Sequence, residues 1–311
     1  MEGDKLQSTL PHYAYLRIAD GCSNKCSYCA IPLIRGKMRS RKMENIIEEA
    51  KKFAENGVKE LVIVAQDVTA YGIDLYKKYA LPDLLKELCK IDGIKWIRLL
   101  YCYPERMTDE LIETIKTEDK VLNYIDIPIQ HCNKEILRNM YRGGDEQSLR
   151  ELFAKLRREI PGVVLRTTLI TGFPGETEEQ FSELAEFVND IKFERLGCFA
   201  YSAEEDTPAA EMPDQVDEGE RQRRADIITS EQEIRMGEYY AGMVGNTYEV
   251  VCEGFDRYSD MYFGRSMHFA PEIDGMIYFT SAKDKSSLTI GDFVNVKITD
   301  VLENNLLGER V

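Results

Sequence analysis

The chain has 311 residues, which is enough for one large hydrophobic core and a smaller second domain. Hydrophobic residues make up 43% of the chain, and no apolar run approaches the roughly 20 residues needed to cross a bilayer, so we expect no membrane partner. The formal net charge of −15 argues against a general polyanion binder and favours a basic partner.

Residues 12–19 alternate apolar and polar side chains as a strand does, and they lead directly into a cysteine-rich stretch. There Cys22, Cys26 and Cys29 follow the spacing CxxxCxxC, so one short loop can direct three sulfurs at one metal centre. Thiolates select zinc, copper(I) or iron–sulfur clusters. On a 4Fe–4S cluster, which four thiolates usually hold, three cysteines leave one iron open to a small molecule.

Two other interpretations of these cysteines need to be considered. Eight cysteines are too few for a disulfide framework, and nothing at the N-terminus resembles a secretory signal, so we expect a cytoplasmic protein with reduced thiols. A structural zinc site needs four ligands, usually as two pairs, and no second pair is found. A distant fourth ligand, His131 or Cys132, would keep the zinc interpretation possible.

Beyond the cysteines, strand-like and helix-like patterns alternate along the chain. This alternation predicts repeated βα units, and therefore an α/β fold with a parallel sheet in a partial (β/α)6, TIM-like barrel. The predicted strands are 12–19, 61–65, 94–100, 124–128, 163–171 and 196–201, and the predicted helices are 43–56, 82–91, 108–116, 134–140, 146–159 and 177–190.

In such folds, ligands bind at the carboxyl ends of the strands. Several candidate residues follow the predicted strands, and together they predict a binding site on one rim, although each alone is a weak signal. His131 alone more often packs or caps than binds, and the Gly172–Thr177 turn can be only a tight turn with a helix cap. The candidates are Gln66 and Asp67, Gln130 and His131, the 172–177 turn, and Phe199 and Tyr201.

The last third of the chain has a different character. Residues 203–220 contain eight acidic residues and no Lys or Arg, which is typical of a solvated connector. A polar helix is predicted over 219–240, and short alternating strands follow at 247–252, 261–266, 276–280, 293–301 and 306–311. These strands predict a small antiparallel β-barrel of the oligonucleotide-binding type, with domains at 1–241 and 242–311.

The cysteine loop, with Tyr28 before its last cysteine and AIPLIRGKMRSR after it, resembles the radical S-adenosylmethionine enzymes, and specifically their methylthiotransferase branch. The resemblance covers nearly the whole chain, and the final barrel is similar to their TRAM domain. It implies one 4Fe–4S cluster with an open iron, to which S-adenosylmethionine binds. An electron from a reductant such as flavodoxin or ferredoxin then cleaves S-adenosylmethionine, and the resulting 5′-deoxyadenosyl radical removes a hydrogen atom from the substrate.

The resemblance also implies which residues contact S-adenosylmethionine. This chain has Gln66–Asp67 where many radical enzymes have Gly-Gly-Glu. The implied contacts are Gln66 and Asp67 at the methionine amine, Gln130 near the ribose, Gly172 where the backbone approaches the adenosine, Tyr28 and Phe199 beside the adenine, and Arg166 and Glu176 as secondary polar candidates.

Two branches of the family differ in substrate: one modifies an adenosine of transfer RNA, and the other an aspartate of the twelfth protein of the small ribosomal subunit. Residues 242–311 carry eleven acidic and six basic residues, and an acidic barrel suits a basic ribosomal protein better than RNA. The stretches 124–131, 197–202, 264–267 and 270–275 are similar to the ribosomal-protein branch. A transfer RNA substrate and a non-catalytic iron–sulfur sensor remain the alternatives.

Full-length members of the family carry an additional N-terminal domain with a second 4Fe–4S cluster. Here only about twenty residues precede Cys22, so we expect a part of a longer protein that binds one cluster and does not complete methylthiolation alone. The other cysteines show no cluster spacing and are expected to pack in the core or on the rim. They are Cys89, Cys102, Cys132, Cys198 and Cys252.

Overall fold

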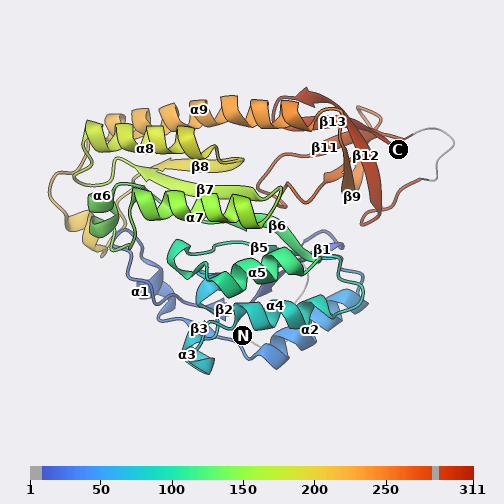
Figure 1. Cartoon of the computed structure of the whole chain (residues 1–311), viewed down its shortest axis with the longest axis horizontal. Helices are drawn as coiled ribbons and strands as arrows, with labels where there is room; N and C mark the ends of the chain where they lie inside the picture. Colours follow the sequence, from blue (N-terminus) through green and yellow to red (C-terminus); the bar gives the residue numbers. More distant parts are fainter. Residues whose placement is uncertain (1–8, 282–286) are drawn as a thin grey trace.

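The computed structural model describes residues 9–281 and 287–311, and its larger part is built on a parallel sheet of six strands. All neighbouring strands pair in parallel, which confirms the predicted α/β fold and partial barrel (Figure 1). In sheet order the strands are β1 (Tyr13–Arg17), β4 (Glu60–Val64), β5 (Trp96–Leu99), β6 (Val121–Asp126), β7 (Val164–Thr171) and β8 (Arg195–Ala200).

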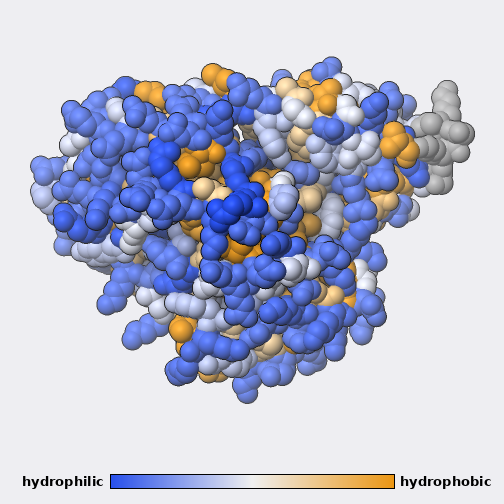
Figure 2. All heavy atoms as spheres, viewed as in Figure 1, coloured by the Kyte–Doolittle hydropathy of each residue, from blue (hydrophilic) through white to orange (hydrophobic). Residues whose placement is uncertain are grey.

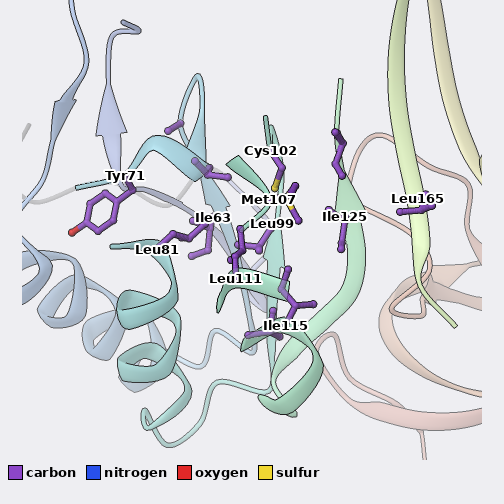
Figure 3. Packing of buried hydrophobic residues seen from close by; sticks show 14 of the residues in the cluster. Ile63, Tyr71, Leu81, Leu99, Cys102, Met107, Leu111, Ile115, Ile125 and Leu165 are labelled. Carbon is purple, nitrogen blue, oxygen red and sulfur yellow. The ribbon is translucent and has the colours of Figure 1, made fainter. Parts of the chain in front are cut away.

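Helices cover one face of this sheet. Strand side chains alternate between the two faces, so every second one packs against these helices. Figure 3 shows Ile63, Leu99 and Ile125 of the strands packing with Leu111 and Ile115 of a helix. The main helices are α2 (Met43–Glu55), α4 (Leu81–Cys89), α5 (Asp109–Thr117), α6 (Lys134–Asn139), α7 (Glu146–Glu159) and α8 (Glu178–Ile191), close to the predicted ranges.

Side-chain caps fix where several of these helices begin. Thr108 caps α5, and Asp145 and Thr177 each form a reciprocal capping box at the start of α7 and α8. Thr177 ends the predicted 172–177 turn, so that turn does include the helix cap considered above. Such caps satisfy backbone N–H groups that lack a partner at a helix start.

Short elements near the cysteines were not predicted. A two-stranded ribbon of β2 (Ala19–Asp20) and β3 (Arg39–Ser40) closes the base of the cysteine loop, and α1 (Ile31–Arg35) lies between them. A further short helix, α3 (Ile73–Tyr76), follows the second strand of the main sheet. Elements of two to five residues carry too little periodicity to be read from sequence.

A long helix, α9 (Glu218–Met243), leads into a closed five-stranded barrel. The barrel confirms the predicted architecture, but the expectation of purely antiparallel pairing is wrong for β11 and β13, which pair in parallel. The other four neighbouring pairs are antiparallel, and five strands in a closed ring cannot all alternate in direction, so the remaining pair is parallel. The strands are β9 (Thr247–Asp256), β10 (Met261–Arg265), β11 (Ile277–Thr280), β12 (Phe293–Leu302) and β13 (Asn305–Arg310).

The barrel packs against the amino-terminal ends of the sheet strands (Figure 1). Glu60, the first residue of β4, bonds both to Arg98 of β5 and to Arg265 of the barrel, at 2.7 and 2.8 Å. Trp96 meets Phe293 edge to face with ring centroids 4.8 Å apart. The opposite, carboxyl-terminal rim of the sheet is left for the cysteine loop.

The visible surface in Figure 2 is mostly hydrophilic, with hydrophobic side chains in scattered groups. Within residues 9–281 and 287–311, no helix has both the length and the apolar character required to span a membrane.

Candidate functional site

The cysteine loop lies between β2 and α1 and is held tightly against the chain that follows it. Gly21 has φ of +72°, and a Cβ there would lie 2.5 Å from the carbonyl oxygen of Lys37. The Cys22 N–H donates to the Gly36 carbonyl at 3.1 Å. Only glycine fits this left-handed, crowded position. Gly21 therefore lets the chain pack closely against Gly36 and Lys37 just before the first cysteine.

The three cysteines of the loop line one cavity of about 470 Å³ at the carboxyl ends of the strands. All three are free thiols and are partly exposed. Burial raises the pKa of Cys22 and Cys29, so a bound metal would be needed to hold both as thiolates near neutral pH. The structure thus places the three cysteines on the wall of one cavity.

The two side chains considered as a distant fourth zinc ligand lie apart from the cysteines. Among the described residues, no group of three or more His, Cys, Asp or Glu side chains, the three cysteines included, is placed to hold a metal ion. His131 and Cys132 are fully buried and do not line the cavity of the cysteines. Three partly exposed thiols around one open cavity instead fit a cluster that keeps one iron free.

Two residues that the sequence did not single out surround Cys26. The Tyr103 hydroxyl lies 3.9 Å from the Cys26 sulfur, and the Arg142 guanidinium lies 4.1 Å from the centroid of the Tyr103 ring. Arg142 donates to the Pro128 carbonyl at 2.8 Å and to the Tyr28 hydroxyl at 3.5 Å. Burial alone would lower the pKa of Arg142, but its neighbours raise it overall, so a firmly held positive charge faces the cavity.

Asp67, expected at the methionine amine, lies beneath the loop rather than on the cavity wall. Its carboxylate accepts hydrogen bonds from Asn24 at 2.9 Å and from Arg106 at 2.6 Å, and Arg106 also donates to the Asn24 amide oxygen. Asn24 stands between the first two cysteines and lines the cavity. The observed contacts of Asp67 therefore position the cysteine loop.

Gln66 and Gln130 do line the cavity, from the ends of β4 and of the segment after β6. Gln130 has φ of +70°, which is uncommon outside glycine, and its backbone bridges to Leu169 of β7. A smaller cavity of about 210 Å³ adjoins the first, and Tyr28 and Gln130 line both. Phe199, 61% exposed, lines only the smaller one.

Gly172 lies away from both cavities, and its close neighbour is a protein side chain. A Cβ at Gly172, where φ is +67°, would lie 2.1 Å from Cγ of Arg221 in α9. The observed close approach at Gly172 is thus made by α9. The Arg221 guanidinium donates to the Tyr201 carbonyl at 2.7 Å.

Glu176 is also directed at α9. Its carboxylate bonds to Arg224 at 2.8 Å, accepts from the Gly172 N–H at 3.0 Å and lies 3.5 Å from His131. Burial alone would raise the pKa of Glu176, but His131 and Arg224 lower it overall. In this structure the turn after β7 therefore packs against α9, and neither Gly172 nor Glu176 lines either of the two cavities described above.

Replacing Gly172 with alanine is expected to destabilise the fold by about 2 to 4 kcal/mol, because the new methyl group combines backbone strain with a clash against Arg221. Gly175 is the matched control: its φ is +82°, but a Cβ there meets nothing within 4 Å. Gly175→Ala should cost only about 1 kcal/mol, the strain alone. Urea unfolding measures the free energy of unfolding of both variants. Equal decreases would show that Arg221 moves aside freely.

Arg166 of β7 likewise forms an ion pair within the six-stranded sheet, at 2.7 Å from Asp126 of β6. Burial is the largest influence on Asp126 and raises its pKa despite this partner. Arg166 lines neither cavity. Of the eight residues expected to contact S-adenosylmethionine, Tyr28, Gln66, Gln130 and Phe199 lie on cavity walls, whereas Asp67, Arg166, Gly172 and Glu176 do not.

The acidic connector after β8 covers part of the loop. Its acidic residues are exposed, apart from the half-buried Glu220. The Ala209 N–H donates to the Ser27 carbonyl at 2.9 Å, between two of the cysteines. Glu204 lines the smaller cavity. The connector thus supports the cysteine loop, which its composition did not reveal.

Comparison with known proteins gives a consistent result. Residues 16–188 match the Radical SAM superfamily, and residues 244–311 match the TRAM domain. Ribosomal protein uS12 methylthiotransferase RimO of Clostridium botulinum strain Hall is 50% identical over 307 residues, covering 99% of this chain and 68% of the relative. The enzyme of the same name from Caldanaerobacter subterraneus subsp. tengcongensis is 50% identical, with coverages of 98% and 69%.

Among solved structures, the radical S-adenosylmethionine methyltransferase TsrM from Kitasatospora setae, with cobalamin and a [4Fe–4S] cluster bound, has a similar fold. The TM-score is 0.54 at 16% identity, over 64% of this chain and 38% of that one. At this identity the likeness concerns the fold alone.

Proposed function

This chain belongs to the Radical SAM superfamily, among the ribosomal protein uS12 methylthiotransferases, and we propose that it adds a methylthio group to the β-carbon of an aspartate in that ribosomal protein. The observation that carries the proposal is the placement of Cys22, Cys26 and Cys29 around one cavity at the strand ends. Three thiolates, and not four, suit a cluster whose remaining iron binds a substrate or cofactor.

In this proposal the residues at the carboxyl ends of the strands bind and orient the cluster and S-adenosylmethionine. Cys22, Cys26 and Cys29 hold the cluster, which together with S-adenosylmethionine supplies a radical that removes hydrogen from the substrate. Tyr28, Gln66, Gln130 and Phe199 bind S-adenosylmethionine across the two adjoining cavities. Asp67, Arg106 and Asn24 keep the cysteine loop in place.

The roles of Arg166, Gly172 and Glu176 are indirect in this proposal. Through Asp126 and α9 they hold the strand ends on which the cavity walls depend. No side chain is assigned as a general base, since the radical removes a hydrogen atom without one.

Charge supports a protein substrate. We take residues 242–311 as the barrel domain, which carries eleven acidic and six basic residues, an unfavourable balance for binding RNA. Lys283, Asp284 and Lys285 of this count lie outside the described residues. A basic ribosomal protein is attracted by such a surface. The site of action is then the cytoplasm, where ribosomes are found.

In this proposal, delivery of the sulfur atom requires a second cluster in addition to the one that the cysteine loop holds. The five cysteines outside the loop lie in separate segments of the chain, and Cys102, Cys132 and Cys252 are buried. We propose that a second 4Fe–4S cluster, held outside these 311 residues, supports full methylthiolation. A low-potential reductant such as flavodoxin or ferredoxin supplies the electron.

The test is hydrogen transfer from a labelled substrate, which does not depend on sulfur delivery. The reconstituted chain is incubated without oxygen with dithionite, S-adenosylmethionine and ribosomal protein uS12 deuterated at its aspartate β-carbons. The proposal predicts deuterium in the 5′-deoxyadenosine that forms. Unlabelled 5′-deoxyadenosine whose yield rises only with transfer RNA would support the RNA substrate, and no cleavage at all would support a sensor.

A further inference from the structure

Arg17, the last residue of β1, lies on the face of the sheet that is turned away from the helices. Leu16 belongs to the core under the helices, whereas Tyr13 and Tyr15 pack on the opposite face. Side chains alternate along a strand, so Arg17 shares the face of the two tyrosines. At the carboxyl end of β1 this face opens into the cavity of about 470 Å³, and Arg17 lines that cavity together with the three cysteines of the loop.

The half-buried side chain of Arg17 has no direct partner. Its guanidinium forms no hydrogen bond or ion pair with any residue that the structure describes. The closest acidic residue in sequence is Asp20, whose carboxylate accepts from the Gly21 N–H at 3.0 Å. The same carboxylate pairs with Arg35 and Arg39 at 3.3 and 3.4 Å. Burial alone would raise the pKa of Asp20, but the Gly21 N–H and the charges of Arg17 and Arg35 lower it overall. Arg17 thus acts on Asp20 only at a distance, and its N–H donors remain available to a ligand.

Arg142 lines the same cavity but is engaged with protein groups. It donates to the Pro128 carbonyl at 2.8 Å, and its guanidinium lies 4.1 Å from the centroid of the Tyr103 ring. A cation that is partly removed from water without a counter-charge is unfavourable, and an anionic ligand relieves that cost. The wall of the cavity at Arg17 therefore fits an anionic group.

Tyr101 is a second sign of a ligand in this cavity. Its φ is +63°, and this conformation is held by the N–H, which donates to the Asp126 carboxylate at 3.0 Å, and by the carbonyl, which accepts from the Val68 N–H at 3.1 Å. Such strained residues other than glycine are concentrated at functional sites. Tyr101 is 45% exposed and lines the cavity, so it offers an aromatic surface to a bound peptide.

A target aspartate carries an anionic group of the right kind. The β-carbon from which hydrogen is removed is bonded directly to the carbon of the side-chain carboxylate. An arginine binds a carboxylate through two parallel N–H···O bonds, which fix the plane of the carboxylate. Holding the carboxylate therefore also holds the β-carbon at a set place in the cavity. The adenine base of a transfer RNA is neutral and would leave the Arg17 guanidinium without a counter-charge.

We propose that Arg17 is a specificity-determining residue, whose guanidinium binds the side-chain carboxylate of the aspartate that loses hydrogen. The inference rests on the proposed function, because only an acidic target residue supplies this carboxylate. It goes further by assigning the recognition of that residue to one side chain of the sheet, separate from any attraction between uS12 and the barrel of β9–β13.

Binding is measured by titrating ribosomal protein uS12 into the reconstituted chain with S-adenosylmethionine and without a reductant, so that no hydrogen is removed. Arg17→Met removes the charge and the N–H donors and is expected to weaken binding about tenfold. Arg17→Lys keeps the charge without the two parallel donors and should recover part of the loss. Arg158→Met is the control, because Arg158 of α7 is exposed and lines neither cavity, and it should leave the affinity unchanged.

Hydrogen transfer is measured with uS12 deuterated at its aspartate β-carbons. Arg17→Met should lower the transfer of deuterium to 5′-deoxyadenosine about 100-fold. The aspartate that loses deuterium is located by mass spectrometry and replaced with a β-deuterated asparagine, which keeps the β-carbon but not the charge. This substrate should react about 100-fold more slowly with the unaltered chain, and Arg17→Met should slow it little further, because both changes remove the same contact. S-adenosylmethionine cleavage without uS12 should be equal in the two chains.

Three results would overturn the role of Arg17. They are equal deuterium transfer by the unaltered chain and Arg17→Met, additive losses from the two substitutions, and a loss of cleavage without uS12 as large as the loss of transfer. The last result would mean that Arg17 contacts S-adenosylmethionine instead. If the unaltered chain transfers no deuterium from uS12, the proposed function itself fails, and this inference fails with it.

Discussion

Replacing Cys26 with alanine is expected to remove the iron of the reconstituted chain and abolish S-adenosylmethionine cleavage. Cys26 is the middle one of the three proposed ligands, and the Tyr103 hydroxyl lies 3.9 Å from its sulfur in the cavity that Arg142 also lines. Two remaining thiolates cannot hold a cluster that three hold only with an open iron. Iron should fall from about four atoms per chain to below about one, as measured by elemental analysis and by the visible absorption of the cluster.

Cys89→Ala is the matched control for this loss. Cys89 ends α4, away from the cavity of the loop, and it is also a partly exposed free thiol. Its replacement should leave the iron content and the cleavage rate unchanged. If Cys26→Ala retained a full complement of iron, or if Cys89→Ala lost as much, the assignment of the three ligands would be wrong.

Replacing Glu60 with alanine is expected to destabilise the protein by about 3 to 5 kcal/mol, because it leaves two buried guanidinium groups without their shared partner. Glu60 is buried and bonds to Arg98 at 2.7 Å and to Arg265 at 2.8 Å, while Arg265 also bonds to Glu253. The ion network joins the sheet to the barrel, so the barrel should loosen with it. Urea unfolding measures the free energy, and limited proteolysis of the barrel shows where the loss occurs.

The interface between the sheet and the barrel also contains a suitable control pair, and the stability that Glu60 contributes there is expected to depend on pH. Glu249→Ala removes an exposed pair with Lys95 and should cost below about 1 kcal/mol. Burial alone would raise the pKa of Glu60, but Arg265 and Arg98 lower it from 4.5 to about 2. Since the folded pKa is depressed, this contribution is present above pH 4.5 and is lost as the pH falls towards 2. Glu60→Ala should remove that part of the acid sensitivity, and equal losses for both variants would contradict a special role for Glu60.

The sequence predicted those parts of the site that follow directly from strand ends. Gln66 and Gln130 come after strands of a parallel sheet, and the structure places both on the wall of the cysteine cavity. The sequence could not distinguish a residue that lines the cavity from one that supports it. Asp67 adjoins Gln66, yet it turns beneath the loop to Asn24 and Arg106.

Arg142 and Tyr103 were missed because neither occupies a position to which a local pattern points. Arg142 lies in the loop between α6 and α7, and it reaches Tyr103 only because the tertiary fold brings the two segments together. The close neighbour of Gly172 was missed for a similar reason. Arg221 belongs to α9, whose docking on the turn after β7 depends on packing across the molecule.

The interface between the six-stranded sheet and the barrel of β9–β13 could not be predicted from the sequence either. Glu60 opens a strand that otherwise reads Leu-Val-Ile-Val, and a charge at that place was the one sign of an unusual partner. That partner, Arg265, lies 205 residues further along the chain. Pattern reasoning gives the elements and their order, whereas long-range pairs depend on how the two domains pack.

The most direct test of the open-iron site is the electron paramagnetic resonance spectrum of the anaerobically reconstituted and reduced chain, recorded with and without S-adenosylmethionine, together with its iron and sulfide content. About four irons per chain and a spectrum that changes when S-adenosylmethionine is added are the predicted result. One zinc per chain and a sample without response to S-adenosylmethionine would contradict the radical mechanism and the assignment of the site.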